Sequence, residues 1–318
     1  MSKVSSRNKL IILSILSVVM VLLYQFIFVD MKYFEYAMHI RTPKSCAMLV
    51  AAFCIGSASI VFQSIIRNRI VTPCLLGMNS LYILIHTALV FFIGGTIFTT
   101  NKYVSFMTDI ALMGMIGTFV YGMLFRKTKY NVLYVLLAGT VLATFFTSIS
   151  NTLTRVMDPN EYDKMLGELV AGFDHVNSEL LLMATALIIV TLFVFYKDVK
   201  LLDVITLGKN QAINLGVDYD RTVSRLLVGV TFFIAIATAL VGPISFLGLI
   251  IANLSREFFK TYKHSYLMIG SALMGVVVLF FGQSLIEHVF GFGTQISVFI
   301  NLFGGGYFLY LVVKNKGV

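Results

Sequence analysis

Charged residues are scarce in this sequence. Asp, Glu, Lys and Arg make up 12% of the 318 residues, whereas hydrophobic residues make up 58%. A soluble domain cannot bury so large an apolar share, and the apolar residues fall in runs long enough to cross a membrane. The composition therefore excludes an ordinary soluble protein and predicts an all-α, polytopic membrane protein.

Residues that build metal and nucleotide sites are few or poorly spaced. There are three cysteines and five histidines, and neither set has the spacing of metal ligands. The sequence contains no G-x-x-x-x-G-K-[ST] P-loop, so it lacks the usual phosphate-binding loop of an ATPase. We expect no metal, no cofactor and no catalytic residue. The cysteines are Cys46, Cys54 and Cys74, and the histidines are His39, His86, His175, His264 and His288.

Nine apolar runs carry the predicted membrane spans. One of them, Leu226–Leu254, is interrupted by Gly242-Pro243 and forms either one long helix or two short ones; two would give about ten transmembrane helices. The other spans are predicted at Leu10–Val29, Ala47–Ile66, Leu76–Ile93, Val104–Phe125, Val132–Ser150, Leu180–Tyr196, Leu267–Phe281 and Ile296–Val313.

Basic residues orient these spans, because cytoplasmic loops collect Lys and Arg. With the N-terminus inside, all but six of the 24 basic residues are cytoplasmic, the six being Lys32, Arg41, Lys44, Lys102, Arg155 and Lys164. A single helix over residues 226–254 would move the last two basic clusters outside, which favours two helices. Both termini are then cytoplasmic. The net charge of +9 is a topology signature and gives no reason to expect nucleic acid as a partner.

The longest polar interruption on the cytoplasmic side is residues 197–225, here called the coupling segment. Its apolar stripes predict two short amphipathic helices at the membrane surface, separated by Gly208 and followed by Gly216. The phrase Leu207-Gly208, Ala212, Leu215-Gly216 resembles the LG-x-x-x-A-x-x-LG segment of permeases in bacterial ABC importers for iron-siderophores, haem and cobalamin. The resemblance implies that this segment contacts the ATPase subunit. Lys209 stands where that family often has Glu, and an ordinary surface connection is the alternative interpretation.

Two further blocks resemble the same family. The first block, Ile40-Arg41-Thr42-Pro43-Lys44, is similar to the family's R-x-P-R entry. The resemblance implies that Arg41 and Lys44 face an extracytoplasmic binding protein, and the alternative is that they anchor a helix end. Pro43 stands where the start of a helix tolerates a proline. Asn68, Pro73 and Leu76-Gly77 match the family's N-P-L-A-x-P-x-x-LG turn. That match implies a cytoplasmic gate at Asn68 and Ile70, and a common interhelical turn is the alternative.

The outer stretch 151–179 carries six acidic and two basic residues, and Tyr162, Met165 and Leu169 lie on one helical stripe. It resembles the family's outer helix, with Lys164 in place of the usual Trp, and surface packing is the alternative to a contact with the binding protein.

Within the spans, Asp109 either reaches the outer interface or lines a wet cavity on the pathway. We expect His86 to be a packing residue, so that no acid–base pair typical of an ion-driven transporter is present.

The resemblance extends from about Arg41 to Leu311 and includes the block Val241–Ile250. It implies a type II ABC importer permease fold, with residues 1–318 as one transmembrane domain in the bacterial cytoplasmic membrane. The implied cargo is a ferric siderophore, with Asn68–Tyr82 most similar to the catecholate or petrobactin-type subgroup, and haem or cobalamin is the alternative. The implied partners are a dimer of ATP-binding subunits, a second permease, identical or paralogous, and an extracytoplasmic substrate-binding lipoprotein. A stand-alone ion-coupled secondary transporter is the alternative from another class.

Overall fold

The computed structural model describes residues 5–29, 31–94, 101–128, 131–173, 176–291 and 294–314, and within these ranges every regular element is helical. The chain ends, residues 1–4 and 315–318, and His175 lie outside the described residues. The elements are α1 (Ser6–Phe26), η1 (Met31–Tyr33), α2 (Phe34–Ile66), η2 (Cys74–Leu76), α3 (Met78–Ile93), α4 (Lys102–Lys127), α5 (Val132–Val156), α6 (Pro159–Leu169), α7 (Ser178–Lys200), α8 (Leu202–Ile205), α9 (Lys209–Asn214), α10 (Tyr219–Val241), α11 (Leu247–Phe259), α12 (His264–His288) and α13 (Ile296–Lys314).

Eight of the described helices are long and apolar enough to cross a membrane: α1, α2, α4, α5, α7, α10, α12 and α13. The apolar helix α3 is shorter, with 16 residues, and α11 has 13. These ten helices correspond to the about ten predicted spans. The prediction of an all-helical, multi-pass membrane protein is confirmed.

The apolar run 226–254 forms two helices. The helix α10 ends at Val241, Gly242 has a φ of 80°, and α11 begins at Leu247. At 1.5 Å per residue, α11 is only about 20 Å long, which is shorter than the ~30 Å hydrocarbon core. The chain therefore turns back at the Gly242-Pro243 interruption, as the distribution of basic residues predicted.

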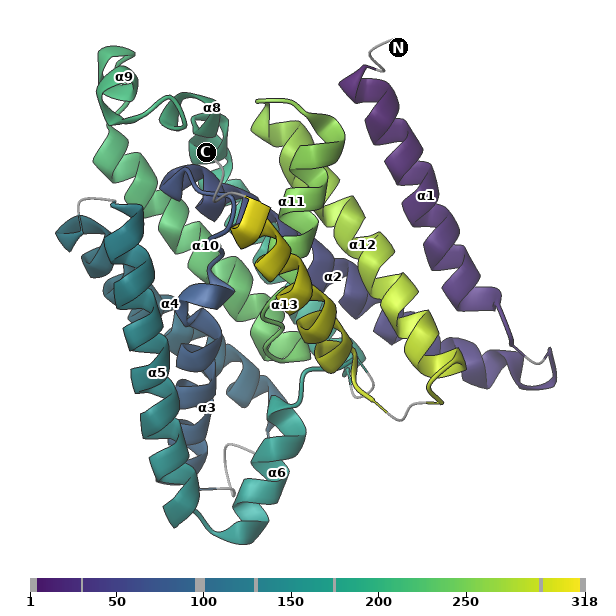
Figure 1. Ribbon diagram of the computed structural model, residues 1–318. Coiled ribbons are helices and arrows are strands. Elements are labelled where there is room, and N and C mark those ends of the chain that lie inside the picture. The colour runs from purple at the N-terminus through teal and green to yellow at the C-terminus, as the bar shows by residue number, and fades with distance from the viewer. Residues whose placement is uncertain are drawn as a thin grey trace.

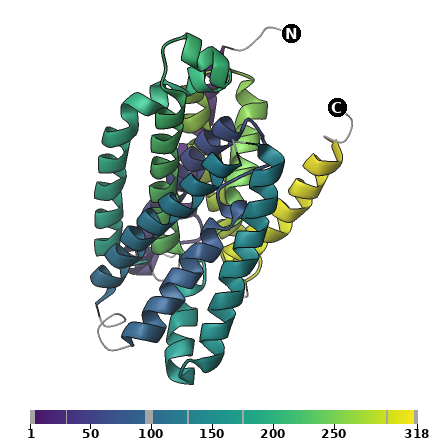
Figure 2. The same ribbon diagram turned by 90° about the vertical axis from the view of Figure 1, so that its left-hand side faces the viewer.

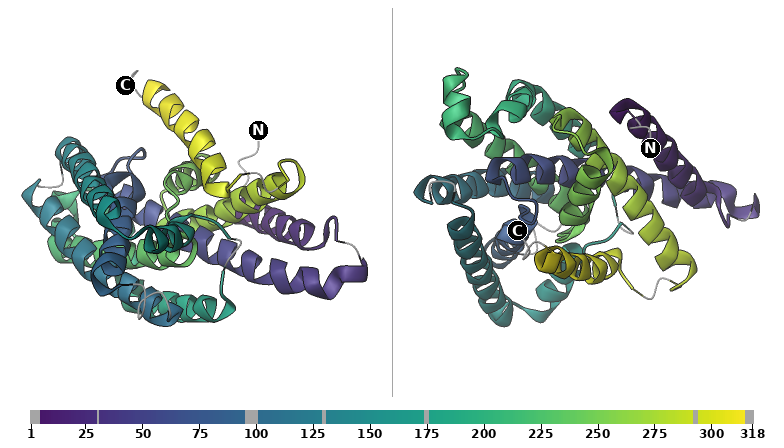
Figure 3. Two further views of the ribbon diagram at one scale, coloured as in Figure 1. Left: turned by 90° about the horizontal axis from the view of Figure 1, so that it is seen from below. Right: turned by 45° about the horizontal axis from the view of Figure 1, so that its top comes forward.

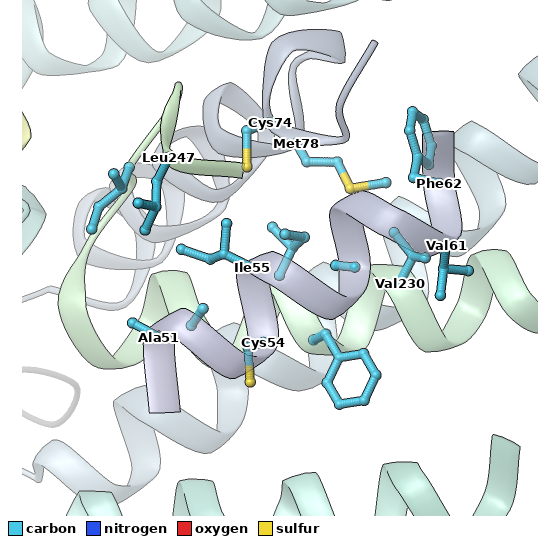
Figure 4. Close-up of a cluster of buried hydrophobic side chains, with 14 of the residues drawn as sticks. Ala51, Cys54, Ile55, Val61, Phe62, Cys74, Met78, Val230 and Leu247 are labelled. Carbon is cyan, nitrogen blue, oxygen red and sulfur yellow. The ribbon is translucent and has the colours of Figure 1, made fainter. Parts of the chain in front are cut away.

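The helix α2 lies at the centre of the bundle (Figure 3, right) and packs against α12, α10, α11 and α7. In its most apolar stretch, 78% of the residues are buried within the protein. In Figure 4, side chains of α2 such as Ile55 and Phe62 meet Met78 of α3, Val230 of α10 and Leu247 of α11. The hydrophobic core of the molecule is thus built around α2.

Small residues allow α2 and α12 to pack closely. A Cβ atom on Gly275 of α12 would lie 2.9 Å from the Cβ of Ala52 in α2. Such close packing stabilises helix association in lipid, where no hydrophobic driving force acts between helices.

The start of α2 differs from the prediction. The helix begins at Phe34, so Pro43 lies inside it and not at its start. A proline inside a helix removes one backbone hydrogen bond. Contacts with the end of α1 hold this part of the chain: the side chain of Gln25 donates to the hydroxyl of Thr42, at 3.0 Å, and accepts from the hydroxyl of Ser45, at 2.9 Å.

The two ends of the bundle differ in chemistry. Figures 1 and 2 show α8 and α9 at the same end as the start of α1, whereas α6 lies at the opposite end. Arg67, Arg126, Lys127 and Lys209 lie at the end with α8 and α9, which is the cytoplasmic end by the distribution of basic residues.

Candidate functional site

The coupling segment contains the two predicted short helices, α8 and α9, at the cytoplasmic end of the bundle (Figure 2). Leu207, Ile213 and Leu215 expose 51%, 51% and 63% of their surfaces, whereas Ala212 is buried. Grouped apolar side chains at the surface are typical of a protein interaction site. The segment therefore offers an apolar contact surface beyond the membrane.

Both predicted glycines of the segment have positive φ angles, 107° at Gly208 and 83° at Gly216. Side chains other than glycine rarely adopt these conformations. At Gly208 a Cβ atom would also lie 3.1 Å from a guanidinium nitrogen of Arg67, at the end of α2, whereas Gly216 has open space around it. Gly208 thus places the coupling segment directly against the chain that leads to the predicted gate.

Lys209, which stands where the family often has Glu, forms an ion pair with Asp220. The Nζ atom lies 2.8 Å from the carboxylate, and the two side chains are 49% and 60% exposed. An exposed pair of this kind contributes about 0–1 kcal/mol to stability. Lys209 is therefore held only weakly and stays accessible to a partner.

Asp203 connects α8 to α12 and does not cap its own helix. Its carboxylate accepts a hydrogen bond from the backbone N–H of His264, at 3.0 Å, and another from Nδ1 of the same residue. The other ring nitrogen of His264 lies 2.9 Å from the hydroxyl of Ser64 in α2. One imidazole therefore joins the coupling segment, α12 and α2.

The predicted gate residues lie on a turn after α2, here called the gate turn (residues 68–70). The side-chain oxygen of Asn68 accepts from the backbone N–H of Ile70 at 2.8 Å. The carbonyl of Arg69 accepts from the side-chain amides of Gln63 in α2 and Asn253 in α11, each at 2.8 Å. The turn is therefore fixed from two sides. The role of Asn68 and Ile70 as a gate remains a prediction.

Arg256 completes a path between the two sites. Its guanidinium donates to the hydroxyl of Ser64 at 2.9 Å and to the side-chain oxygen of Gln63 at 3.2 Å. A continuous set of hydrogen bonds thus runs from the coupling segment to the gate turn. We call this set the polar relay; it comprises Asp203, His264, Ser64, Arg256 and Gln63 and ends at the carbonyl of Arg69.

Arg41 and Lys44 make contacts within the chain. The guanidinium of Arg41 donates to the carbonyls of Tyr24 and Ile27 at the end of α1, at 2.8 and 2.9 Å. Lys44 is 7% exposed and lies 3.5 Å from the carboxylate of Glu287 in α12. These contacts fix the outer ends of three helices. A contact of Arg41 and Lys44 with a binding protein remains a prediction.

Asp109 lines a cavity of about 290 Å³ at the outer side, beside Lys102, Ser105 and Gly242. Its side chain is 2% exposed, and its Oδ2 atom lies 2.8 Å from Nδ1 of His86 in α3. The residue therefore lines a cavity and does not reach out to the interface. Its part in a transport pathway remains a prediction.

The expectation that no acid–base pair lies within the spans was wrong. His86 lies between two carboxylates, because its Nε2 atom is 3.1 Å from the carboxylate of Glu168 in α6, opposite its contact with Asp109. The imidazole and the two carboxylates therefore form an acid–base group at the outer side of the bundle. The sequence could not reveal the group, because its members come from α3, α4 and α6.

The outer helix α6 packs as its stripe predicted. Met165 is buried with Val90 of α3 and Met157, and Tyr162 and Leu169 pack against them. Together with the contact between Glu168 and His86, this packing attaches α6 to α3.

One face of α5 is polar from Thr140 to Thr152, in the outer part of the helix. Its hydroxyl donors bond to carbonyls of the same helix, for example Thr144 to Thr140 and Ser148 to Thr144, at 3.0 and 2.8 Å. Their outer surfaces stay exposed, which is costly against lipid but suits a water-filled path. We call this set the hydroxyl face; it comprises Thr140, Thr144, Thr147, Ser148, Asn151 and Thr152.

A multi-pass helical bundle with a glycine-bounded helix pair on the cytoplasmic side has the form of a membrane permease, a transport subunit. Comparison with known proteins agrees. Residues 8–314 match the model of the FecCD transport family. The chain belongs to the FecCD transport family.

Similar proteins extend over nearly the full chain. The petrobactin import system permease protein YclO of Bacillus subtilis (strain 168) is 38% identical over 311 residues, which cover 98% of this chain and 99% of the relative. The petrobactin import system permease protein FatC of Bacillus anthracis is 33% identical over 273 residues, covering 86% and 77%. The structure of a metal-chelate type ABC transporter in an inward-facing conformation is similar in fold, with a TM-score of 0.81 at 22% identity, covering 98% of this chain and all of that one.

Proposed function

We propose that this chain is the permease subunit of an ATP-driven importer that carries a ferric siderophore of the petrobactin type across the bacterial cytoplasmic membrane. The observation that carries the proposal is the 38% identity to a petrobactin import permease over almost the whole of both chains. Relatives this similar over their full length share their architecture, and the cargo class is inferred from them.

The partners follow from the sites. An ATP-binding subunit dimer contacts the coupling segment, where Leu207 and Leu215 expose more than half of their surfaces. The chain itself has no P-loop, so ATP is hydrolysed on that dimer. A second permease, identical or paralogous, completes the path, and a substrate-binding lipoprotein delivers the cargo outside.

The hydroxyl face of α5 supports a polar route for the cargo. Its exposed hydroxyl and amide groups form a row along one side of a membrane helix, where lipid contact would leave them without water. When a second permease lies opposite, two such rows enclose a wet path. Only the broad polarity of the cargo is selected there, and the lipoprotein supplies the finer specificity.

Uptake of radioactive iron tests the cargo. A strain without its own siderophore permeases is supplied with this chain, the ATP-binding subunit, the partner permease and the lipoprotein. We expect uptake from ferric petrobactin at least about tenfold above uptake from a ferric trihydroxamate or haem, which is a preference of about 1.4 kcal/mol. Equal or faster uptake of haem would overturn the proposed cargo.

The energy source of uptake separates an ATP-driven importer from an ion-coupled secondary transporter. The second class is considered because it often has an acid–base pair within the membrane, as His86 and Asp109 form here. Depletion of ATP should stop uptake, and collapse of ion gradients at constant ATP should leave it running. The reverse pattern would refute the importer.

A further inference from the structure

A large groove lies between α4 and α10 in the cytoplasmic half of the bundle. Its volume is about 1370 Å³. The wall deeper in the membrane is apolar and includes Phe119, Met123 and Val228, whereas the mouth is lined mainly by charged residues. Part of the mouth, including Lys209 and Arg221, belongs to the coupling segment, but neither that segment nor the hydroxyl face accounts for the apolar wall.

The mouth of the groove carries uncompensated positive charge. Lys209 is paired with Asp220, and Arg225 donates to the carboxylate of Asp198 at 3.0 Å. Three more basic residues line the mouth together with one further carboxylate, Asp218; in the described part of the chain none of the three forms an ion pair, and two positive charges remain in excess. These three are Arg126, Lys127 and Arg221, and all are exposed.

The apolar wall begins directly beneath these charges. Met123 and Phe119 precede Arg126 by three and seven residues on α4, or about 5 and 10 Å along the helix axis. They expose 44% and 70% of their surfaces. A basic patch at the cytoplasmic surface above an exposed apolar wall has the profile of a phospholipid, with its headgroup at the interface and its chains below.

We propose that this groove binds an anionic phospholipid of the cytoplasmic leaflet. Its phosphate lies among Arg126, Lys127 and Arg221, and an acyl chain runs along Met123 and Phe119. A free phosphate ion would leave the apolar wall unexplained. A soluble protein could not reach side chains about 10 Å below the membrane surface, which makes lipid the occupant that fits both halves.

The sequence contains no tryptophan, so a single introduced tryptophan reports on the groove without background. The reporter is Phe119→Trp in the full chain, reconstituted in vesicles with a constant share of anionic lipid. Bromine on the acyl chains of either phosphatidylglycerol or phosphatidylcholine quenches its fluorescence. A matched control is Ile189→Trp on α7, which is 61% exposed, lies eight residues from the basic Lys197 and does not line this groove.

We expect brominated phosphatidylglycerol to quench Phe119→Trp at a mole fraction at least about fivefold lower than brominated phosphatidylcholine requires, which is the factor given by about 1 kcal/mol, the contribution of a single basic residue. The control should show a ratio near one. Replacing Arg126, Lys127 and Arg221 by Gln should bring the ratio at Phe119→Trp near one as well. If the triple variant is unstable, the comparison of the two lipids at Phe119→Trp in the unaltered groove still tests the proposal.

Four results would overturn the proposal. Equal quenching by the two lipids at Phe119→Trp would exclude a lipid preference, and the same preference at Ile189→Trp would assign it to the general charge of the surface. Loss of the preference in millimolar inorganic phosphate would indicate a site for free anions. Protection of the reporter by added ATP-binding subunit would assign the groove to a protein contact.

Discussion

Breaking the polar relay at Asp203 should uncouple ATP hydrolysis from transport. The replacement Asp203→Ala removes both hydrogen bonds between the coupling segment and His264. The other members of the relay stay in place, since each has a further partner. The ATPase subunit can then still dock and hydrolyse ATP, but its movement reaches the gate turn through apolar packing alone.

The size of the effect follows from the two lost contacts. A hydrogen bond to a charged group contributes about 1.5–3 kcal/mol. Because the Asp203 side chain is 42% exposed and screened by water, we assign about 1.5–3 kcal/mol to the two contacts together. If this energy links the two sites, uptake per ATP hydrolysed falls by about 10- to 150-fold.

The assay measures ATPase rate and cargo uptake in the same proteoliposomes. Asp203→Asn keeps an oxygen for the backbone N–H of His264 and should give an intermediate loss. Lys263→Ala removes an exposed charge directly before His264 in the sequence. Lys263 is not a member of the polar relay, so this change should alter uptake less than twofold. In a double-mutant cycle, adding His264→Gln to Asp203→Ala should cause little further loss, because both changes break the same path from Asp203 through the imidazole to Ser64.

Uptake per ATP within twofold of the parent in Asp203→Ala would refute the reasoning. An equal fall in ATPase rate and uptake would also refute it, since that result indicates failed docking of the ATPase. Full additivity in the double-mutant cycle would show that the two residues act independently.

Three further predictions concern the other sites. Gly208→Val should abolish uptake while the protein stays inserted, because it adds about 1–3 kcal/mol of backbone strain and meets the end of α2; Gly216→Asn should be tolerated, since Asn adopts positive φ and the space is open. His86→Leu should lower stability in detergent by about 3–5 kcal/mol by leaving Asp109 buried without its partner, and adding Asp109→Leu should restore most of the loss in thermal unfolding. Thr144→Val should slow uptake with a stability change within about 0.5 kcal/mol, whereas Thr144→Ser should transport normally.

Each of these predictions has an outcome that contradicts it. Normal uptake with Gly208→Val would remove the coupling segment from the mechanism. If the double variant of His86 and Asp109 is less stable than His86→Leu, then the loss in His86→Leu does not come from leaving Asp109 without a partner. Unchanged uptake with Thr144→Val would indicate that this part of the hydroxyl face is not wetted.

The elements that depend on local chemistry could be predicted from the sequence. Long apolar runs and the positions of basic residues predicted the helices and their orientation, and the glycines predicted the two short helices α8 and α9. The prediction that α2 starts at Pro43 was wrong. It relied on the local preference of proline for a helix start, whereas contacts of Arg41 and Thr42 with α1 hold the helix on both sides of Pro43.

Contacts between distant helices could not be predicted. The group of Asp109, His86 and Glu168 joins α3, α4 and α6, and the polar relay joins α2, α8, α11 and α12. Each member taken alone is an ordinary polar residue at a helix end or within a span. Only the fold brings Arg256 and Asn253 of α11 beside Gln63 and the gate turn.

The central position of α2 has a consequence for synthesis of the protein. This helix leaves the ribosome second, but α10, which covers much of it, begins about 150 residues later. At about 5–20 residues per second, α2 waits roughly 8–30 seconds for that neighbour, and longer for α12. During that time Lys44 lacks its contact with Glu287 of α12, and Gln63 lacks its contact with Arg256 of α11. The nascent chain therefore depends on the membrane insertion machinery to shelter α2, and a truncation within α12 would expose it to quality-control proteases although α2 itself is intact.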